Sequence, residues 1–233
     1  MKKQMLKMLL GTLMIAFLIA CGGGTKGYYL SPNFKMKATS HRTVAVLPFD
    51  VVTGGTPPEG LTDARKQQIQ EEEAKIFQQS LYNSLVSNLG RSAIQIQTPN
   101  KTNNLLRDKG ISLTKAAQRN PEELAKMLGV DAVVFATVTK YRYLDDKASM
   151  GIGMGKNALS VATGGRSNVF TSGMNSKTND VKVTCSLIEA RDGDVLWKTN
   201  HDGSADWNRP ANTVVDNLNT HLASNFPYKY LKK

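Results

Sequence analysis

The sequence predicts an α/β domain with a mixed, partly parallel sheet of about five strands, flanked by helices and carrying a flexible Gly/Ser-rich insert. Two runs, 43–49 and 132–138, are almost entirely apolar, which is typical of strands buried on both faces. A long helical pattern lies between them, and this strand–helix–strand order implies a right-handed crossover between parallel strands. A later pair of strands, 181–189 and 194–199, is joined by a tight turn and adds antiparallel pairing. Together these segments predict a single domain over residues 43–227.

The first half of the domain starts with a strand and a long helix. Residues 44–47 are four consecutive apolar residues that end at a proline, and a Gly- and Pro-rich loop follows. Over residues 63–89 the apolar side chains recur at helical spacing, and Gly90 supplies a C-terminal cap. The acidic run 71–73 falls mostly on the solvent side of this helix. A short alternating strand over 93–97 comes next.

A second helix is predicted from its capping residues. Asn120 can cap the helix, Pro121 suits its first position, and Glu123 can reach back to the cap amide. Gly129 ends the helix. The strand that follows, 132–138, is the most apolar outside the leader, so we expect it at the centre of the sheet.

The last three elements form a hairpin and a closing helix. Strand 181–189 alternates with a period of two and places Cys185 on its apolar face, which indicates a small core residue and not a catalytic thiol. The Asp192-Gly193 pair supplies the positive φ angles that a tight hairpin needs. Apolar residues at helical spacing predict the final helix near 210–225.

The start of the chain has the pattern of a secretory leader. Residues 8–20 are uncharged and largely apolar, and three lysines precede or flank their start. About thirteen such residues are too few to cross a hydrocarbon core, which takes roughly 20 in a helix, so residues 1–20 are predicted to be a signal peptide. Residues 18–21, LIAC, resemble the bacterial lipobox, which implies fatty-acyl chains such as palmitate on Cys21. An ordinary signal peptide with a chance cysteine and a membrane protein with an unusual first helix are the alternatives. Gly22, where an inner-membrane retention signal would have Asp, favours the outer membrane.

The mature chain, residues 21–233, is basic. Without the three leader lysines, 27 basic residues remain against 19 acidic ones. In the periplasm this excess suggests polyanions such as anionic lipid head groups or cell-wall carboxylates, and no nucleic-acid partner is expected there. Residues 21–42 lack periodicity and are predicted to be a lipidated tether, and 228–233 a basic tail.

A glycine-rich insert is expected over residues 145–180. Its start alternates apolar residues with glycine, which would place Met150, Ile152 and Met154 on one face if the chain is extended. These three residues are candidate partner contacts. The alternation persists for only six residues, whereas a membrane strand needs about 9–11. A flexible loop is the simpler interpretation.

Three stretches resemble one superfamily of bacterial envelope lipoproteins. They are VAVLPFD (44–50), LAKMLGVDAVVFATVTKY (124–141) and VKVTCSLIEARDGDVLWKTN (181–200), and the pattern that they belong to covers about two-thirds of the mature chain. The superfamily includes the curli-secretion pore lipoprotein, the penicillin-binding-protein activator lipoproteins and the amino-terminal domain of the Tol–Pal propeller protein. The resemblance implies a non-enzymatic interaction or assembly module of a cell-envelope machine, with envelope protein partners. The alternative that it implies is a homo-oligomeric subunit of an outer-membrane secretion pore, although 201–210 is short for a second pore hairpin. Ala190 departs from the pattern, since an acid is often found there.

Motifs for catalysis, cofactors and metals are missing from the sequence. Gly155-Lys156 is followed by Asn157, which breaks the phosphate-loop pattern, and no nucleophile elbow is present. The histidines, His41, His201 and His221, lack metal-like spacing. The sequence therefore predicts a protein that is not an enzyme and holds no cofactor or metal. It predicts an outer-membrane lipoprotein that faces the periplasm.

Overall fold

The computed structural model describes residues 27–54, 60–90, 92–140, 177–206 and 211–231. The strands are β1 (Tyr28–Leu30), β2 (Thr43–Val46), β3 (Asp50–Thr53), β4 (Gln95–Gln97), β5 (Ala132–Lys140), β6 (Lys177–Glu189) and β7 (Val195–Asp206). The helices are α2 (Phe34–Ala38), α3 (Asp63–Leu89), α4 (Pro99–Asp108), α5 (Leu113–Ala116), α6 (Pro121–Leu128) and α9 (Ala211–Ser224), followed by a 3₁₀ turn, Pro227–Tyr230.

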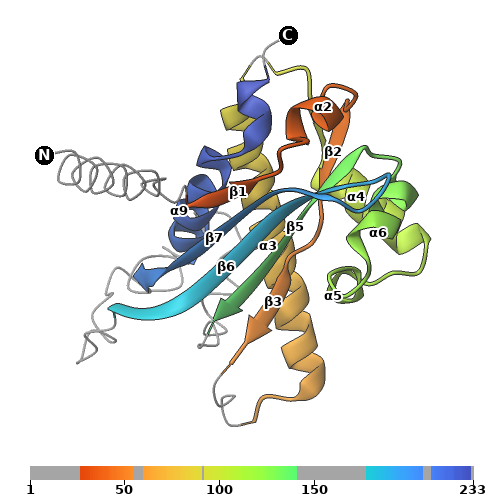
Figure 1. The fold of residues 1–233 in the computed structure, drawn as a ribbon. Coiled ribbons are helices and arrows are strands. Elements are labelled where there is room, and N and C mark those ends of the chain that lie inside the picture. Colours follow the sequence, from red (N-terminus) through yellow and green to blue (C-terminus); the bar gives the residue numbers. More distant parts are fainter. Residues whose placement is uncertain (1–26, 55–59, 91, 141–176, 207–210, 232–233) are drawn as a thin grey trace, which may run out of the picture.

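The strands form a mixed sheet that is covered by helices on both faces. The order is β1-β7-β6-β5-β2-β4, and β3 pairs with β5 outside this path. Helices α3 and α9 lie over one face, and α4, α5 and α6 gather on the other (Figure 1). The predicted class is confirmed, with seven strands in place of about five. The two additional strands, β1 and β3, have only three and four residues.

The parallel half of the sheet is built on β5, the expected central strand. Both β2 and β4 run parallel to their neighbours, with Ala45 opposite Gln97 on one side and Val133 on the other. Strand β3 continues along β5 where β2 stops, pairing Val51 with Val138. Pro48 lies at the break between β2 and β3, since proline has no N–H to donate to a ladder.

The antiparallel half consists of β5, β6, β7 and β1. Strand β6 pairs with all nine residues of β5, from Ala132 opposite Glu189 to Lys140 opposite Val181. It begins at Lys177, four residues before the strand that the sequence predicts. Positive φ angles were expected at both Asp192 and Gly193 in the turn to β7. Gly193 alone has one, 73°, and its N–H donates to the carbonyl of Glu189.

Each helical layer covers a separate apolar core. The larger core lies between the sheet and helices α3 and α9 and includes Val134, Cys185 and Trp197, each about 1% exposed. The smaller core lies under α4, α5 and α6 and includes Leu47 and Leu106. Cys185 is therefore the core residue that the alternation predicts, and burial raises the pKa of its thiol.

A described strand and a described helix lie inside the segment that was predicted to be a tether. Strand β1 pairs with β7, and α2 buries Phe34 against the larger core. The predicted basic tail is also wrong at its start, because Tyr228 is fully buried and its ring lies 5.4 Å from that of Phe34. Strand β1, helix α2 and the 3₁₀ turn have three, five and four residues, which is too short for periodicity to show. Contacts with distant residues hold them in place.

Two buried polar contacts hold α3 in place. Gln78 and Asn103 exchange side-chain hydrogen bonds of 3.0 and 2.9 Å, and Gln78 also donates to the carbonyl of Val46. Closer to the N-terminus of α3, the carboxylate of Glu73 lies 2.5 Å from the ammonium of Lys140 at the end of β5. Glu73 is thus the exception in an acidic run that was expected mostly in solvent.

Candidate functional site

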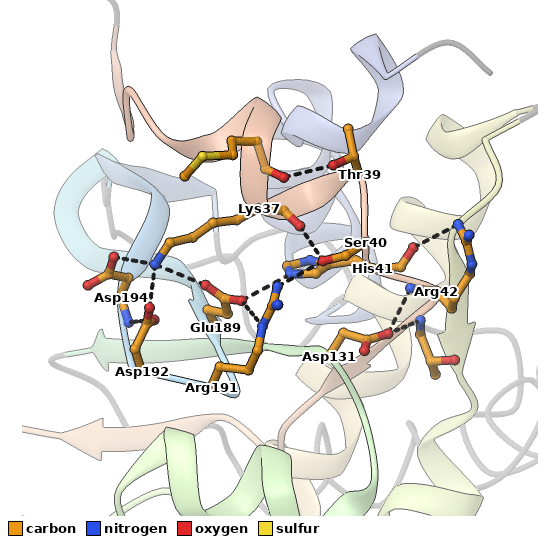
Figure 2. Close-up of polar contacts among 12 residues, drawn as sticks. Lys37, Thr39, Ser40, His41, Arg42, Asp131, Glu189, Arg191, Asp192 and Asp194 are labelled. Carbon is orange, nitrogen blue, oxygen red and sulfur yellow. Dashed lines mark hydrogen bonds and ion pairs between the residues drawn. The ribbon is translucent and has the colours of Figure 1, made fainter.

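The main polar cluster lies where α2, the start of β2, the start of β5 and the β6–β7 turn meet. Figure 2 shows its side chains converging from these four places. Its members are Lys37, Ser40, His41, Arg42, Asp131, Glu189, Arg191, Asp192 and Asp194. Among these residues, the sequence predicts a role only for those of the turn, and that role is conformational.

Lys37 is the cation at the centre of this cluster. Its Nζ lies 2.5 Å from Asp194, 2.6 Å from Asp192 and 3.0 Å from Glu189. Hydrogen bonds to Asp192 and Asp194 raise the pKa of Lys37, and the ammonium in turn lowers the pKa of Asp192. The short helix α2 is thereby fixed to the far end of the β6–β7 hairpin.

Glu189 connects the exposed and buried parts of the cluster. Its side chain is 1% exposed, and Arg191 donates from Nε to its carboxylate at 2.7 Å. The same guanidinium donates from Nη2 to the hydroxyl of Ser40 at 2.8 Å. A buried carboxylate needs such cationic partners, because an unpaired one would cost several kcal/mol.

His41 and Tyr228 lie behind Glu189. The Nδ1 of His41 is hydrogen-bonded to the hydroxyl of Tyr228, and its Nε2 is 3.6 Å from Glu189. Burial lowers the pKa of His41, against the opposing effect of Glu189, and burial raises the pKa of Tyr228. A general acid or base must reach the substrate directly or through one water. These three side chains are at most 1% exposed, so their geometry suits structural support and not proton transfer to a substrate.

Asp131 fixes the backbone beside the cluster. Its carboxylate accepts hydrogen bonds from the amides of Arg42 and Thr43, at 2.7 and 2.9 Å. Gly129, in the left-handed conformation with φ 65°, ends α6 two residues earlier. The sequence identified this glycine as a helix end, and the structure confirms it. The LGVD phrase is therefore a turn that positions β5.

Two small hollows flank the cluster. One of about 300 Å³ is lined by Ser40, Asp131 and Arg191 among others. The other, of about 170 Å³, is lined by His41 and Ile94 among others. Small-molecule sites usually occupy about 300–1,000 Å³ and bury most of the ligand. The two hollows are at or below that lower limit.

Two histidines that the sequence separates lie together in the fold. The rings of His201 on β7 and His221 on α9 have centroids 4.8 Å apart, and burial and His221 lower the pKa of His201. The neighbouring carboxylate, Asp202, lies 3.4 Å from the ammonium of Lys182. Among the described residues, no group of three or more His, Cys, Asp or Glu side chains could hold a metal ion.

The remaining predicted site residues lie outside the described ranges. These are the lipidation candidate Cys21 and the partner-contact candidates Met150, Ile152 and Met154. None of the helices in the described ranges combines the length and apolar character that crossing a membrane requires.

No protein-family model and no curated protein sequence matches the chain. Several solved structures are similar in fold. Lipoprotein GNA1162 from Neisseria meningitidis is 15% identical over 79% of this chain and 95% of its own, with a TM-score of 0.38. The LpoB C-terminal domain from Salmonella enterica is 10% identical over 80% and 90%, with a TM-score of 0.33. A PelC dodecamer from Paraburkholderia phytofirmans is 14% identical over 82% and 90%, with a TM-score of 0.38. At such identities the likeness concerns the fold alone.

Proposed function

We propose that the protein is an outer-membrane lipoprotein that faces the periplasm and serves as a non-enzymatic interaction or assembly module of a cell-envelope machine. The observation that carries this proposal is the leader, in which a basic start and a short apolar run end in LIAC at Cys21. Diacylglyceryl and amino-terminal acyl chains on Cys21 would give lasting attachment, because two or more chains bind a bilayer far more firmly than one.

The polar cluster supports a role without catalysis. Its acid–base groups, His41, Glu189 and Tyr228, are buried against one another. Its exposed carboxylates, Asp192 and Asp194, are both held by the ammonium of Lys37. Such contacts hold the end of the β6–β7 hairpin rigid, which is useful in a domain that presents a surface to a partner.

The partner contact is proposed on the sequence between β5 and β6. The alternation at 150–155 puts Met150, Ile152 and Met154 on one face of an extended chain. An apolar face of this kind is favourable only when a partner, a lipid or another subunit covers it. The partner would be an envelope protein.

Fractionation of cells tests the anchor. The Cys21→Ala protein should leave the outer-membrane fraction and lose its acyl groups in mass spectrometry. Cys185→Ala is the matched control, since it removes the only other cysteine, a buried one. That control should remain in the membrane. A Cys21→Ala protein that still sediments with outer membrane and carries acyl chains would exclude the lipoprotein assignment.

Deletion of the glycine-rich segment tests the partner contact. Residues 147–176 are replaced by a short Gly-Ser bridge, and crosslinked complexes are recovered from the envelope. Recovery of the partner should fall to background while the melting temperature changes little. Unaltered recovery would remove these residues from the proposed contact, and unfolding would assign them to the core.

Light scattering on the full chain in detergent separates the module from its alternative, the secretion-pore subunit. A monomer or a small oligomer supports an interaction module. A stable ring of eight or more copies would favour the pore subunit and would contradict the proposal.

A further inference from the structure

Helices α4 and α5, with the turns that follow them, carry a basic surface. Between residues 98 and 119 the chain has five basic residues and one acid, Asp108. All five are exposed. We call them the basic face: Lys101, Arg107, Lys109, Lys115 and Arg119.

The cations of the basic face are not neutralised by the fold. Across the described ranges of the chain, none of the five forms a salt bridge or donates a side-chain hydrogen bond. Several lysines elsewhere in the fold are paired, for example Lys126 with Glu122 at 2.5 Å and Lys182 with Asp202. Unpaired cations in one region create a positive potential that attracts anions from solution.

Packing in the smaller core explains why these cations face solvent. Helix α4 buries Thr102, Asn103 and Leu106, which leaves Lys101 and Arg107 on its other side. Helix α5 buries Leu113 and Ala116 and leaves Lys115 exposed. The arrangement is set by the apolar side of each helix, so the charges are held in place without contacts of their own.

The basic face lies at the opposite end of the sheet from β1, the first described strand. Helix α4 directly follows β4, and β4 and β1 are the two ends of the strand order. Figure 1 shows β1 and α4 on opposite sides of the sheet. Five strand spacings separate them, or about 24 Å at ~4.8 Å each. The seven residues from Cys21 to Tyr28 reach about 25 Å at full extension. If the basic face lay on the anchoring membrane, the chain from Cys21 to Tyr28 would therefore have to be almost fully extended.

We propose that the basic face binds the carboxylate-rich polymer of the cell wall. This inference rests on the envelope location in the proposed function. A chain held at its β1 end presents the α4–α5 end away from the membrane, toward polyanions of the periplasm. Long, exposed lysine and arginine side chains suit a repeating polyanion, because they adapt to many carboxylate positions without a preformed pocket. The contact is a diffuse electrostatic one and weakens as salt screens it.

Co-sedimentation with isolated peptidoglycan sacculi tests this proposal. The full chain in a nonionic detergent is compared with Lys101→Glu/Lys109→Glu/Lys115→Glu. The matched control is Lys35→Glu/Lys75→Glu/Lys198→Glu, which changes the net charge equally at exposed positions outside the basic face. We expect the first variant to bind at least tenfold more weakly and the control less than threefold. Wild-type binding should fall at least tenfold between about 0.05 and 0.5 M salt, as the Debye length shortens several-fold. Circular dichroism verifies that both variants fold.

Each other outcome overturns the proposal. Equal loss in both variants would assign binding to total charge and not to the basic face. Binding to phosphatidylglycerol vesicles but not to sacculi would identify a lipid surface as the partner. No binding to either would leave the basic face without this role. Because the assay uses purified protein, its result does not depend on whether Cys21 is lipidated. The binding proposal can therefore fail while Cys21 is lipidated, and it can hold when Cys21 is not.

Discussion

The buried ion pair between Glu73 and Lys140 allows a quantitative prediction. The two side chains are 2% and 1% exposed, and the carboxylate and ammonium are 2.5 Å apart. They join α3 to the last residue of β5. Lys140→Met leaves the carboxylate buried without its counter-charge, which costs about 3–5 kcal/mol when one partner of such a pair is removed. This is a large part of the ~5–15 kcal/mol that stabilises a typical domain.

The melting temperature gives the expected size of this effect. For a chain of this length each kcal/mol lowers the melting temperature by about 2–4 °C, so Lys140→Met should melt about 6–20 °C lower at pH 8. Burial raises the pKa of Glu73, against the opposing effect of Lys140. Without Lys140 the raised value means that stability is present at low pH and is lost as pH rises. The deficit should therefore be smaller at pH 5.

Two further variants complete the experiment. Lys75→Met removes an exposed lysine from α3, the helix of Glu73. The lysine lies 3.8 Å from Glu71, and its loss should lower the free energy of unfolding by less than about 1 kcal/mol. Glu73→Gln/Lys140→Met removes both charges and should recover most of the stability. Urea unfolding followed by circular dichroism measures all three. The reasoning fails if Lys140→Met is within 1 kcal/mol of wild type, or if the double variant loses as much as the single one.

Three other predictions concern the core, the hairpin turn and the histidines. Val134→Asp should unfold the domain, because it places an unpaired carboxylate in the centre of the sheet; near wild-type melting would contradict the sheet order. Gly193→Ala should cost about 1–2 kcal/mol, because Gly193 has a φ of 73° and the new Cβ would lie 2.7 Å from Glu122 Oε2; unchanged urea unfolding would contradict the turn. Burial lowers the pKa of His41 and of His201, so stability should fall as pH drops below about 6.5. His201→Gln should reduce that slope between pH 5 and 6.5, and an unchanged slope would exclude His201 as a source.

Several elements could be predicted from the sequence because their signals are local. The caps at Gly90, Asn120 and Gly129 and the periodicity of α3 are encoded within a few residues of each element. Helix α4 has a similar local signal. Thr98 caps it and Pro99 occupies its first position, much as Asn120 and Pro121 do for α6.

Other features could not be predicted because they depend on contacts between distant residues. Lys37 looks like a tether residue until the fold brings it to Asp192, 155 residues later. Tyr228 looks like part of a basic tail, and its burial depends on Phe34 and His41 from the other end of the domain. These contacts depend on the strand order, which no single segment specifies.

The intact mass of the protein purified from the cell envelope tests the central claim most directly. The account predicts a mature chain that begins at Cys21, with the mass of a diacylglyceryl group and an amino-terminal acyl chain added to residues 21–233. A chain that retains residues 1–20, or one that begins near Cys21 with a free thiol and no acyl groups, would contradict it.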